Sequence, residues 1–450
     1  MPLPQSQPAG ASLPVAGRHG PDVARVLSAG SLRSQYQPIF SVLSQRLVGL
    51  EALARATDPD TSEPIAPLPL FEAAESQGLT LALDRLCREK AVEGFATSPM
   101  LDGKELLFLN LDVSILDDGV VGSGQLIQLV ERFGLCPHRV VIELIESRIR
   151  DMSAIRRFLD THRRHGFLIA LDDVGAGNSN LDRIVELSPD ILKLDRSLIC
   201  GLDKDYRKRE VFSCCMRIAH KLGVVVIAEG VETESEALAC LEHGSDLMQG
   251  YFFARPRFPG PDAQVAEALG RIASLASVVR ERQAENFVAK KARYREYAAI
   301  ANRIAGLVGE QPQEAWASHI GAELACNPFV ECAYVLDQTG FQITDTIFGP
   351  GRRGNRASLL FAPAVIGADQ GSKDYFICLG PDQRRFVTDP YLSRSTGTLC
   401  VTLSTLVPLS PSCAVVVCVD IDTTAEANRS PKNVGARPAA QEPVIADGMR

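Results

Sequence analysis

Between residues 31 and 258, short apolar runs rich in β-branched residues alternate with stretches of helical spacing. Strands that are buried on both faces have continuous apolar runs of this kind, and their alternation with helices predicts parallel βα units. Because so many units follow one another in about 225 residues, a closed barrel is favoured over an open sheet. We therefore expect an α/β fold, a TIM-like (β/α)8 barrel, over residues 31–258. The runs that carry this prediction are 34–40, 105–110, 139–144, 167–173, 190–195 and 223–229.

The pattern changes after residue 258. Residues 259–313 combine helical spacing with many Ala and charged residues, which predicts a long linker helix, or two. Its apolar stripe fits packing on a partner chain, as in a homodimer, as well as packing on the barrel. Residues 314–422 begin with a helical segment and continue with strand-like runs, which predicts a compact α+β module. Within it we expect a hairpin that turns near Thr339-Gly340, and a strand over 373–379.

The two ends of the chain have a different composition. Residues 1–30 are rich in Pro, Gly, Ala and Ser, which predicts a flexible tail with a short lead-in helix. Residues 423–450 are polar and contain Pro, which predicts disorder. No apolar run reaches the ~20 residues that span a bilayer, and the first residues lack a signal-peptide pattern. We therefore expect a cytoplasmic protein with no membrane span.

Composition and charge narrow the choice of partners. A content of 46% hydrophobic and 23% charged residues is typical of a globular protein. The net charge of −8 argues against a nucleic-acid polymer as partner, because such binding relies on clustered Lys and Arg. Twelve cysteines include no CxxC pair, which indicates reduced structural thiols in a reducing compartment.

Polar residues stand where the apolar runs of the predicted barrel end. In a parallel barrel all these ends emerge on one rim, the face on which barrel enzymes place their chemistry. Carboxylates crowded on one rim raise each other's pKa and destabilise the fold unless a cation is bound. A single strand-end acid commonly caps a helix, but that interpretation does not fit so many acids together. The residues are Glu51, Asn110, Glu143, Asp172, Asp173, Lys193, Glu229 and Gln249.

The chemistry of this set predicts a metal centre. Carboxylate and amide oxygens are ligands for hard divalent cations, here Mg²⁺ or Mn²⁺. The adjacent Asp172 and Asp173 suit the bridging of two ions, and two-metal sites activate a water and stabilise phosphoryl displacement. Lys193 adds positive charge near the attacking water or the developing oxyanion. The residues alone therefore predict two-metal hydrolysis.

An ordered series of motifs supports a resemblance to a known family. The series is YQPI (36–39), EALAR (51–55), ELIES (143–147), DDVG (172–175), KLD (193–195), AEGVET (228–233) and QGY (249–251). With these motifs, residues 33–258 resemble the EAL phosphodiesterases, which hydrolyse cyclic di-GMP to linear pGpG.

The resemblance implies a role for each matching residue. Glu51, Asn110, Glu143 and Asp172 would hold one metal ion. Asp172, Asp173 and Glu229 would hold a second, and Glu229 would also activate the water. Lys193 would contact that water, and Gln249 would orient the site. Gln37 and Arg55 would contact the substrate, and Arg55 suits a phosphate oxygen. Glu146 would steady the loop after the two aspartates. The catalytic residues on this reading are Glu229, Lys193 and Glu51.

Two departures from the family pattern keep alternatives open. Where the family usually reads DDFGTGYSS, residues 172–180 read DDVGAGNSN, and Ile145 replaces the usual Thr. No expected metal ligand is changed. A cyclic di-GMP receptor without turnover is therefore an alternative to an enzyme, and a purely scaffolding role is a third hypothesis.

Residues 314–422 are similar in pattern to the PAS- or Cache-like signalling domains. Lys373-Asp374-Tyr375 and Thr388-Asp389-Pro390-Tyr391 place charged and aromatic groups near strands that would line a pocket. A small-molecule ligand in this domain is therefore one hypothesis, and it would regulate the barrel. A dimerisation module without a ligand is the other.

Overall fold

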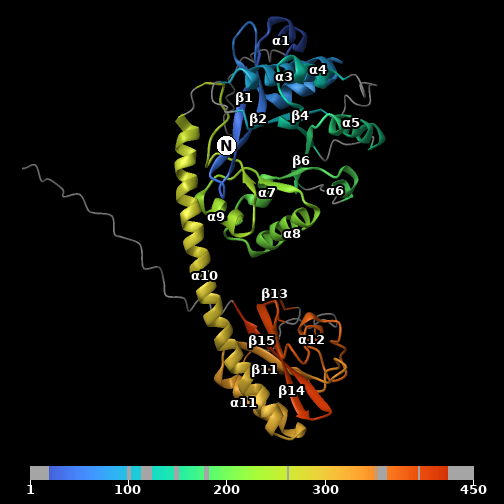
Figure 1. Ribbon diagram of the computed structural model, residues 1–450, viewed down its shortest axis with the longest axis vertical. Helices are drawn as coiled ribbons and strands as arrows, with labels where there is room; N and C mark the ends of the chain where they lie inside the picture. The colour runs from blue at the N-terminus through green and yellow to red at the C-terminus, as the bar shows by residue number, and fades with distance from the viewer. Residues whose placement is uncertain are drawn as a thin grey trace, which may run out of the picture. The chain divides into compact units, whose positions relative to one another are not determined.

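The computed structural model describes residues 20–98, 103–112, 124–145, 152–176, 182–260, 263–349, 351, 362–393 and 396–423. The chain divides into two compact units, Met1–Gln283 and Ala284–Arg450 (Figure 1). The division falls inside the segment predicted as a linker. The described helices include none that combines the length and the apolar character that a membrane crossing requires.

The first unit contains a closed barrel of eight strands among the described residues, which confirms the predicted fold. The order around the barrel is β1-β9-β8-β7-β6-β5-β4-β2, and β1 closes it by pairing with β2. A short strand, β3 (Pro64–Ile65), extends the sheet beyond β2. The barrel strands are β1 (Leu32–Ser41), β2 (Arg46–Thr57), β4 (Leu106–Leu111), β5 (Val140–Ile145), β6 (Leu168–Val174), β7 (Ile191–Leu194), β8 (Val225–Ala228) and β9 (Leu247–Met248).

The expectation of an all-parallel barrel is wrong for one strand. β1 runs antiparallel to both of its neighbours, β2 and β9, whereas the other neighbouring barrel strands are parallel. Only residues 42–45 join β1 to β2. So short a connection makes a hairpin, because a parallel crossover needs a dozen or more residues.

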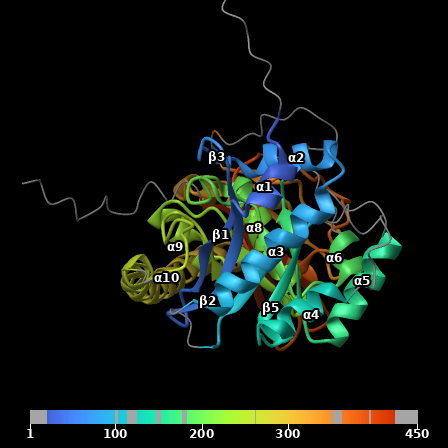
Figure 2. The same ribbon diagram turned by 90° about the horizontal axis from the view of Figure 1, so that it is seen from above.

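Helices surround the barrel strands and bury the main core against them (Figures 1 and 2). Phe95 of α3, Phe158 of α5 and Phe212 of α8 belong to this core together with strand residues such as Leu107 and Leu144. The helices of this part are α1 (Val23–Ala29), α2 (Pro67–Ser76), α3 (Thr80–Ala96), α4 (Gln125–Arg132), α5 (Met152–Arg164), α6 (Asp182–Leu187), α7 (Arg196–Ile199), α8 (Tyr206–Leu222) and α9 (Glu234–Glu242), with a 3-10 turn at Pro137–Arg139.

One long helix, α10 (Ala263–Glu310), occupies most of the segment predicted as a linker. Its first part contributes Ile272 and Val279 to the core of the first unit. Its last part contributes Ile300 and Ile304 to the core of the second unit. The predicted helix is therefore continuous.

The second unit is an antiparallel sheet covered on one face by helices. The sheet order is β11-β10-β15-β14-β12, and β13 pairs with β14. Trp316 and Ile320 of α11 pack on Val335 and Val417 of the sheet. The elements are α11 (Gln313–Cys326), β10 (Val330–Leu336), β11 (Ile347–Phe348), α12 (Asp374–Ile377), β12 (Arg385–Val387), β13 (Tyr391–Leu392), β14 (Leu399–Ser410) and β15 (Cys413–Asp422).

Two local predictions for this unit have different outcomes. The hairpin is confirmed, because β10 and β11 pair in antiparallel fashion and Gly340 lies in the turn between them. The strand predicted over 373–379 is wrong, because α12 forms there. Tyr375, Phe376 and Leu379 share one face of a helical turn and pack on the sheet, whereas Ile377 is 62% exposed.

Candidate metal centre

An apolar layer fills the inside of the barrel, and polar side chains follow it along the strands. Because every second residue of a strand faces the same side, the residue two positions beyond an inward one also points inward. The apolar layer consists of Ile39, Phe108, Val141, Ala170, Ile191, Ile227 and Leu247. On β1, which runs antiparallel to its neighbours, a step of two residues toward the N-terminus leads from Ile39 to Gln37. On the parallel strands the step leads to Asn110, Glu143, Asp172, Lys193, Glu229 and Gln249.

A bulge in β6 changes where its last carboxylates point. Asp172 and Asp173 together oppose the single residue Lys193 of β7. In a regular strand two adjacent side chains would face opposite sides of the sheet. Asp173 instead adopts a φ of 59°, a left-handed conformation that costs a non-glycine residue roughly 1–2 kcal/mol. The bulge therefore brings both carboxylates to one cluster, in which oxygens of Asp172, Asp173 and Glu229 lie within 4.8 Å of one another.

The ammonium group of Lys193 lies among four carboxylates. Its Nζ is 2.7 Å from Glu143 Oε1 and 2.8 Å from Glu229 Oε1. It donates a hydrogen bond of 3.2 Å to Asp172 Oδ2 and lies 3.6 Å from Glu51 Oε2. The side chain is 1% exposed, so these carboxylates rather than water stabilise its charge.

Two amide side chains fix the carboxylate of Glu51. Gln249 Nε2 donates to Glu51 Oε2 at 2.6 Å, and Asn110 Nδ2 donates to Glu51 Oε1 at 3.2 Å. Gln37 faces Glu51 in the ladder between β1 and β2. Two strands that are distant in sequence from β2, namely β4 and β9, therefore hold its carboxylate in a defined position.

The cluster is strained electrostatically. Burial raises the pKa of Glu143 well above its ordinary value, and the neighbouring carboxylates add to this effect. Burial also raises the pKa of Glu229 to about 8 and, with less force, the pKa of Asp173. Burial works against the charge of Lys193, but the carboxylates around it outweigh that effect and raise its pKa. The site therefore holds more negative charge than one lysine compensates.

These residues fit two divalent cations. Two groups of carboxylates have ligand oxygens within 4.8 Å of one another, and they share one member. Five carboxylates and one ammonium leave four negative charges, which two divalent ions would neutralise. Apart from the ion pair of Oε1 with Lys193, the buried carboxylate oxygens of Glu143 have no hydrogen-bond partner among the described residues. The groups are Glu51, Glu143 and Asp172, and Asp172, Asp173 and Glu229.

The structure brings most of the predicted site residues together, with two exceptions. Arg55, on β2 beyond Glu51, is half-buried; it donates to Gln35 Oε1 at 2.7 Å and to the carbonyl of Ala54 at 2.8 Å. Burial lowers the pKa of this guanidinium. Glu146 lies outside the described residues, as does the part of the loop that covers 177–180.

Sequence reasoning missed a buried ion pair on α3. Asp84 and Arg88 form a salt bridge one helical turn apart and are 3% and 8% exposed. They line a cavity of about 280 Å³ that Arg55 and Asn110 also line. Burial raises the pKa of Asp84. The sequence does contain an indication of this pair, namely two opposite charges four residues apart on a helix face that is otherwise apolar.

Comparisons with known proteins concern mainly the part of the chain that forms the barrel. The family model described as EAL domain matches residues 22–256. The protein named Cyclic di-GMP phosphodiesterase RocR, from Pseudomonas aeruginosa, is 31% identical over 241 residues, which cover 52% of this chain and 60% of that protein. The uncharacterized EAL-domain containing protein YkuI, from Bacillus subtilis, is 30% identical over 224 residues, which cover 49% of this chain and 54% of that protein.

A solved structure is similar over a longer part of the chain. It is the crystal structure of the Bacillus subtilis YkuI protein, with an EAL domain, in complex with substrate c-di-GMP and calcium. The TM-score is 0.74 at 22% identity, and the match covers 90% of this chain and 99% of that one. At this identity the likeness shows the fold alone. The chain spans between 28% and 60% of the lengths of the first curated relatives it matches.

Proposed function

The chain belongs to the EAL domain family, and from this premise we propose that it is a metal-dependent phosphodiesterase that hydrolyses cyclic di-GMP to linear pGpG. The observation that carries the proposal is the pair of carboxylate groups that share Asp172 and surround Lys193. A relative of 31% identity is named a cyclic di-GMP phosphodiesterase, which supports the choice of substrate.

The proposed metal ligands divide into two sets. Glu51, Asn110, Glu143 and Asp172 would hold one ion, and Asp172, Asp173 and Glu229 the other. Mg²⁺ or Mn²⁺ suits these oxygen donors. When bound, such ions would lower the pKa of a water molecule, so that it can lose a proton and attack at neutral pH. They would also supply positive charge for the phosphate oxygens.

The other proposed roles follow from position and charge. Glu229 accepts a proton from the attacking water, and Lys193 places a positive charge beside the same point. Gln249 keeps Glu51 oriented through its 2.6 Å hydrogen bond. Gln37 and Arg55 bind the substrate, Arg55 through a phosphate oxygen. Glu146 steadies the loop after Asp173.

A receptor that binds cyclic di-GMP without turnover is the second candidate. The changed loop sequence after Asp173 favours it, because Val174, Ala176 and Asn178 stand where the family usually has Phe, Thr and Tyr. Both candidates use the same residues for binding. They differ in whether a product forms.

The test is incubation of the purified chain with cyclic di-GMP and Mg²⁺ or Mn²⁺, with pGpG followed by chromatography. Glu51→Gln keeps the shape of the side chain but removes its charge, so pGpG formation should fall to background. Glu63→Gln, at an exposed position outside the barrel interior, is the matched control and should keep wild-type activity. Nucleotide binding by the wild type without any product would support the receptor instead. Wild-type turnover by Glu51→Gln would refute the ligand assignment.

We also propose that the second unit regulates the barrel and that the chain forms a homodimer. α10 carries Phe287 and Val288, each 67% exposed, and a second copy would cover them. Light scattering of the purified chain tests this proposal, and a monomer would contradict it. The PAS- or Cache-like nature of residues 314–422 and a cytoplasmic location stay predictions, as do the domain boundaries at 30, 258, 313 and 422.

A further inference from the structure

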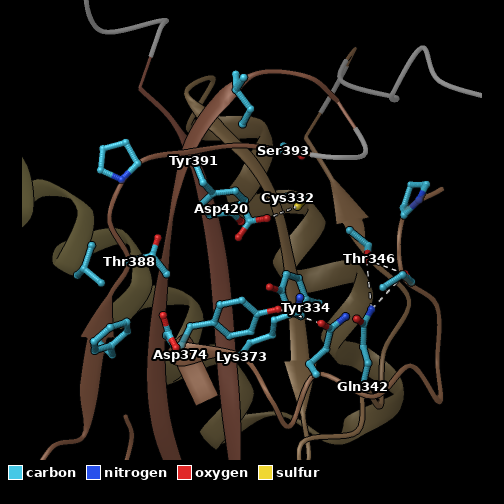
Figure 3. Close-up of a pocket in the computed structure, with 18 of the residues that line it drawn as sticks. Cys332, Tyr334, Gln342, Thr346, Lys373, Asp374, Thr388, Tyr391, Ser393 and Asp420 are labelled. Carbon is cyan, nitrogen blue, oxygen red and sulfur yellow. Dashed lines mark hydrogen bonds between the residues drawn. The ribbon is translucent and has the colours of Figure 1, made fainter. Parts of the chain in front are cut away.

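The second unit contains a cavity of about 760 Å³ on the face of its sheet that α11 does not cover. Side chains alternate along β10 and β15, so Val335 and Val417 face α11 while Tyr334, Cys332 and Asp420 face the cavity. Figure 3 shows these last three at its floor, with residues of the later loops around them. The volume falls within the usual range for small-molecule sites.

The floor of the cavity contains a carboxylate with no cationic partner in the described part of the chain. Asp420 is 8% exposed, and no Lys, Arg or His among the described residues forms a salt bridge with it. Its Oδ1 accepts a 2.8 Å hydrogen bond from Thr402. Cys332 Sγ lies 3.5 Å from its Oδ2 (Figure 3). Neutral donors satisfy part of its hydrogen-bonding capacity but leave its charge uncompensated. A buried charge of this kind is costly unless an opposite charge is bound beside it.

The rest of the lining is also acidic. Among the described lining residues, Asp374, Asp389 and Asp420 are acidic and Lys373 is basic, which leaves two negative charges. Lys373, Asp374 and Asp389 are exposed and lie toward solvent, whereas Asp420 is deep. Glu331, whose charge acts on Asp420, is 1% exposed, and its Oε2 has no hydrogen-bond partner in the described part of the chain. The potential inside the cavity therefore attracts cations.

The other walls fit an organic cation better than a metal ion. Tyr334, Tyr375, Tyr391 and Phe386 line the cavity, and aromatic rings attract organic ammonium groups and cover methylene chains. Burial raises the pKa of each of these three tyrosines, so they stay neutral donors and acceptors. Among the described residues, groups of three or more close metal ligands occur in the barrel and not in this cavity. The amide oxygen of Gln342, a buried lining residue, also lacks a donor.

We propose that this cavity is a binding site for a small organic ammonium compound, whose ammonium group pairs with Asp420 while its carbon chain lies between the tyrosine rings. The far end of the compound lies at the mouth, beside Asp374 and Lys373. A second ammonium group would face the aspartates there, and a carboxylate would face the lysine. This inference concerns binding by the second unit and does not depend on turnover in the barrel.

The test is titration calorimetry of the full chain with four probes that share a four-carbon skeleton. Putrescine carries two ammonium groups, γ-aminobutyrate one ammonium and one carboxylate, succinate two carboxylates, and butanediol no charge. We expect heat of binding from putrescine, from γ-aminobutyrate or from both, and none from succinate or butanediol. Which of the two ammonium compounds binds tells whether the aspartates or the lysine contact the far end.

Asp420→Asn is the decisive variant, because Asn keeps the size and can still accept from Thr402. Affinity for the ammonium compound should fall by roughly tenfold or more, since a charged hydrogen bond is lost. Asp382→Asn, at an exposed aspartate outside the cavity, is the matched control and should bind like the wild type. Fluorescence of Trp316, in the core of the same unit, checks that each variant is folded. Absence of binding by both ammonium compounds, equal binding of succinate or butanediol, or unchanged affinity in Asp420→Asn would overturn the proposal.

Discussion

Replacement of Asp420 by Asn should make the second unit more stable at neutral pH in the absence of any ligand. Burial is the main cause that raises the pKa of Asp420 from 3.8 to about 6, and the nearby carboxylate of Glu331 adds to it. The folded state therefore keeps a proton on Asp420 at pH values where the unfolded chain has already released it. Between about pH 4 and pH 6 the folded state binds more protons, so stability falls as pH rises.

The size of the effect follows from the two pKa values. A pKa of about 6 in the folded state against 3.8 in an exposed chain corresponds to roughly 3 kcal/mol, at about 1.4 kcal/mol for each factor of ten in proton affinity. Asn carries no proton to release, so Asp420→Asn does not lose this stability. The difference in unfolding free energy between variant and wild type should grow by roughly 2.4 kcal/mol from about pH 4 to about pH 7, because a small part of the effect is already present at pH 4. Other titrating groups contribute to both proteins and largely cancel in the difference.

The chain offers a convenient probe for this measurement. Its single tryptophan, Trp316, is buried in the core of the second unit, so its fluorescence in urea follows the unfolding of that unit. Asp382→Asn serves as control and should follow the wild type at every pH. The groups around Asp420 include Cys332, whose pKa burial raises, so this thiol stays neutral in the range. A difference that does not change with pH would refute the assignment of an uncompensated charge to Asp420.

Three further outcomes concern the barrel. Lys193→Met leaves the surrounding carboxylates without a counter-charge, so the free energy of unfolding, measured with urea in EDTA, should fall by about 3–5 kcal/mol. An unchanged urea midpoint would contradict the role described for the ammonium group. Asp173→Gly relieves a left-handed φ of 59° and should gain about 1 kcal/mol in EDTA, yet Mg²⁺ should stabilise it less than the wild type in a thermal melt. Gly250→Ala would place a Cβ 2.1 Å from the carbonyl oxygen of Val231 and displace the neighbouring Gln249, so pGpG formation should drop by roughly tenfold or more. Gly260→Ala, where a Cβ meets nothing within 4 Å, should leave activity intact.

The inward polar layer was predictable because it follows from periodicity. Once apolar runs are assigned to barrel strands, an inward Phe108 implies an inward Asn110, and an inward Val141 implies an inward Glu143. The family resemblance then adds roles, but the grouping of side chains needs no family. The same logic fails where the backbone departs from regularity. No pattern in the sequence indicates that β6 bulges, although the bulge decides that Asp173 joins Asp172.

Three other features could not be predicted from the sequence, for a more general reason. The direction of β1 depends on the length of its connection to β2, and an apolar run carries no sign of direction. The sequence of the short helix α12 also fits a strand, because an apolar run of a few residues matches both periods. The sequence does not mark out Asp420, because it lies in an apolar strand. Its role depends on Thr402 and on tyrosine rings that are distant in sequence. Contacts between remote segments are what the sequence reports least.

Lys193 gives the barrel a tethered cation of its own. A centre built only of carboxylates would depend on captured ions to offset the mutual repulsion of its charges as the strands close. With the ammonium group within 4 Å of four carboxylates, part of the repulsion is relieved from the moment the strands close. Closure of the barrel therefore depends less on the capture of ions.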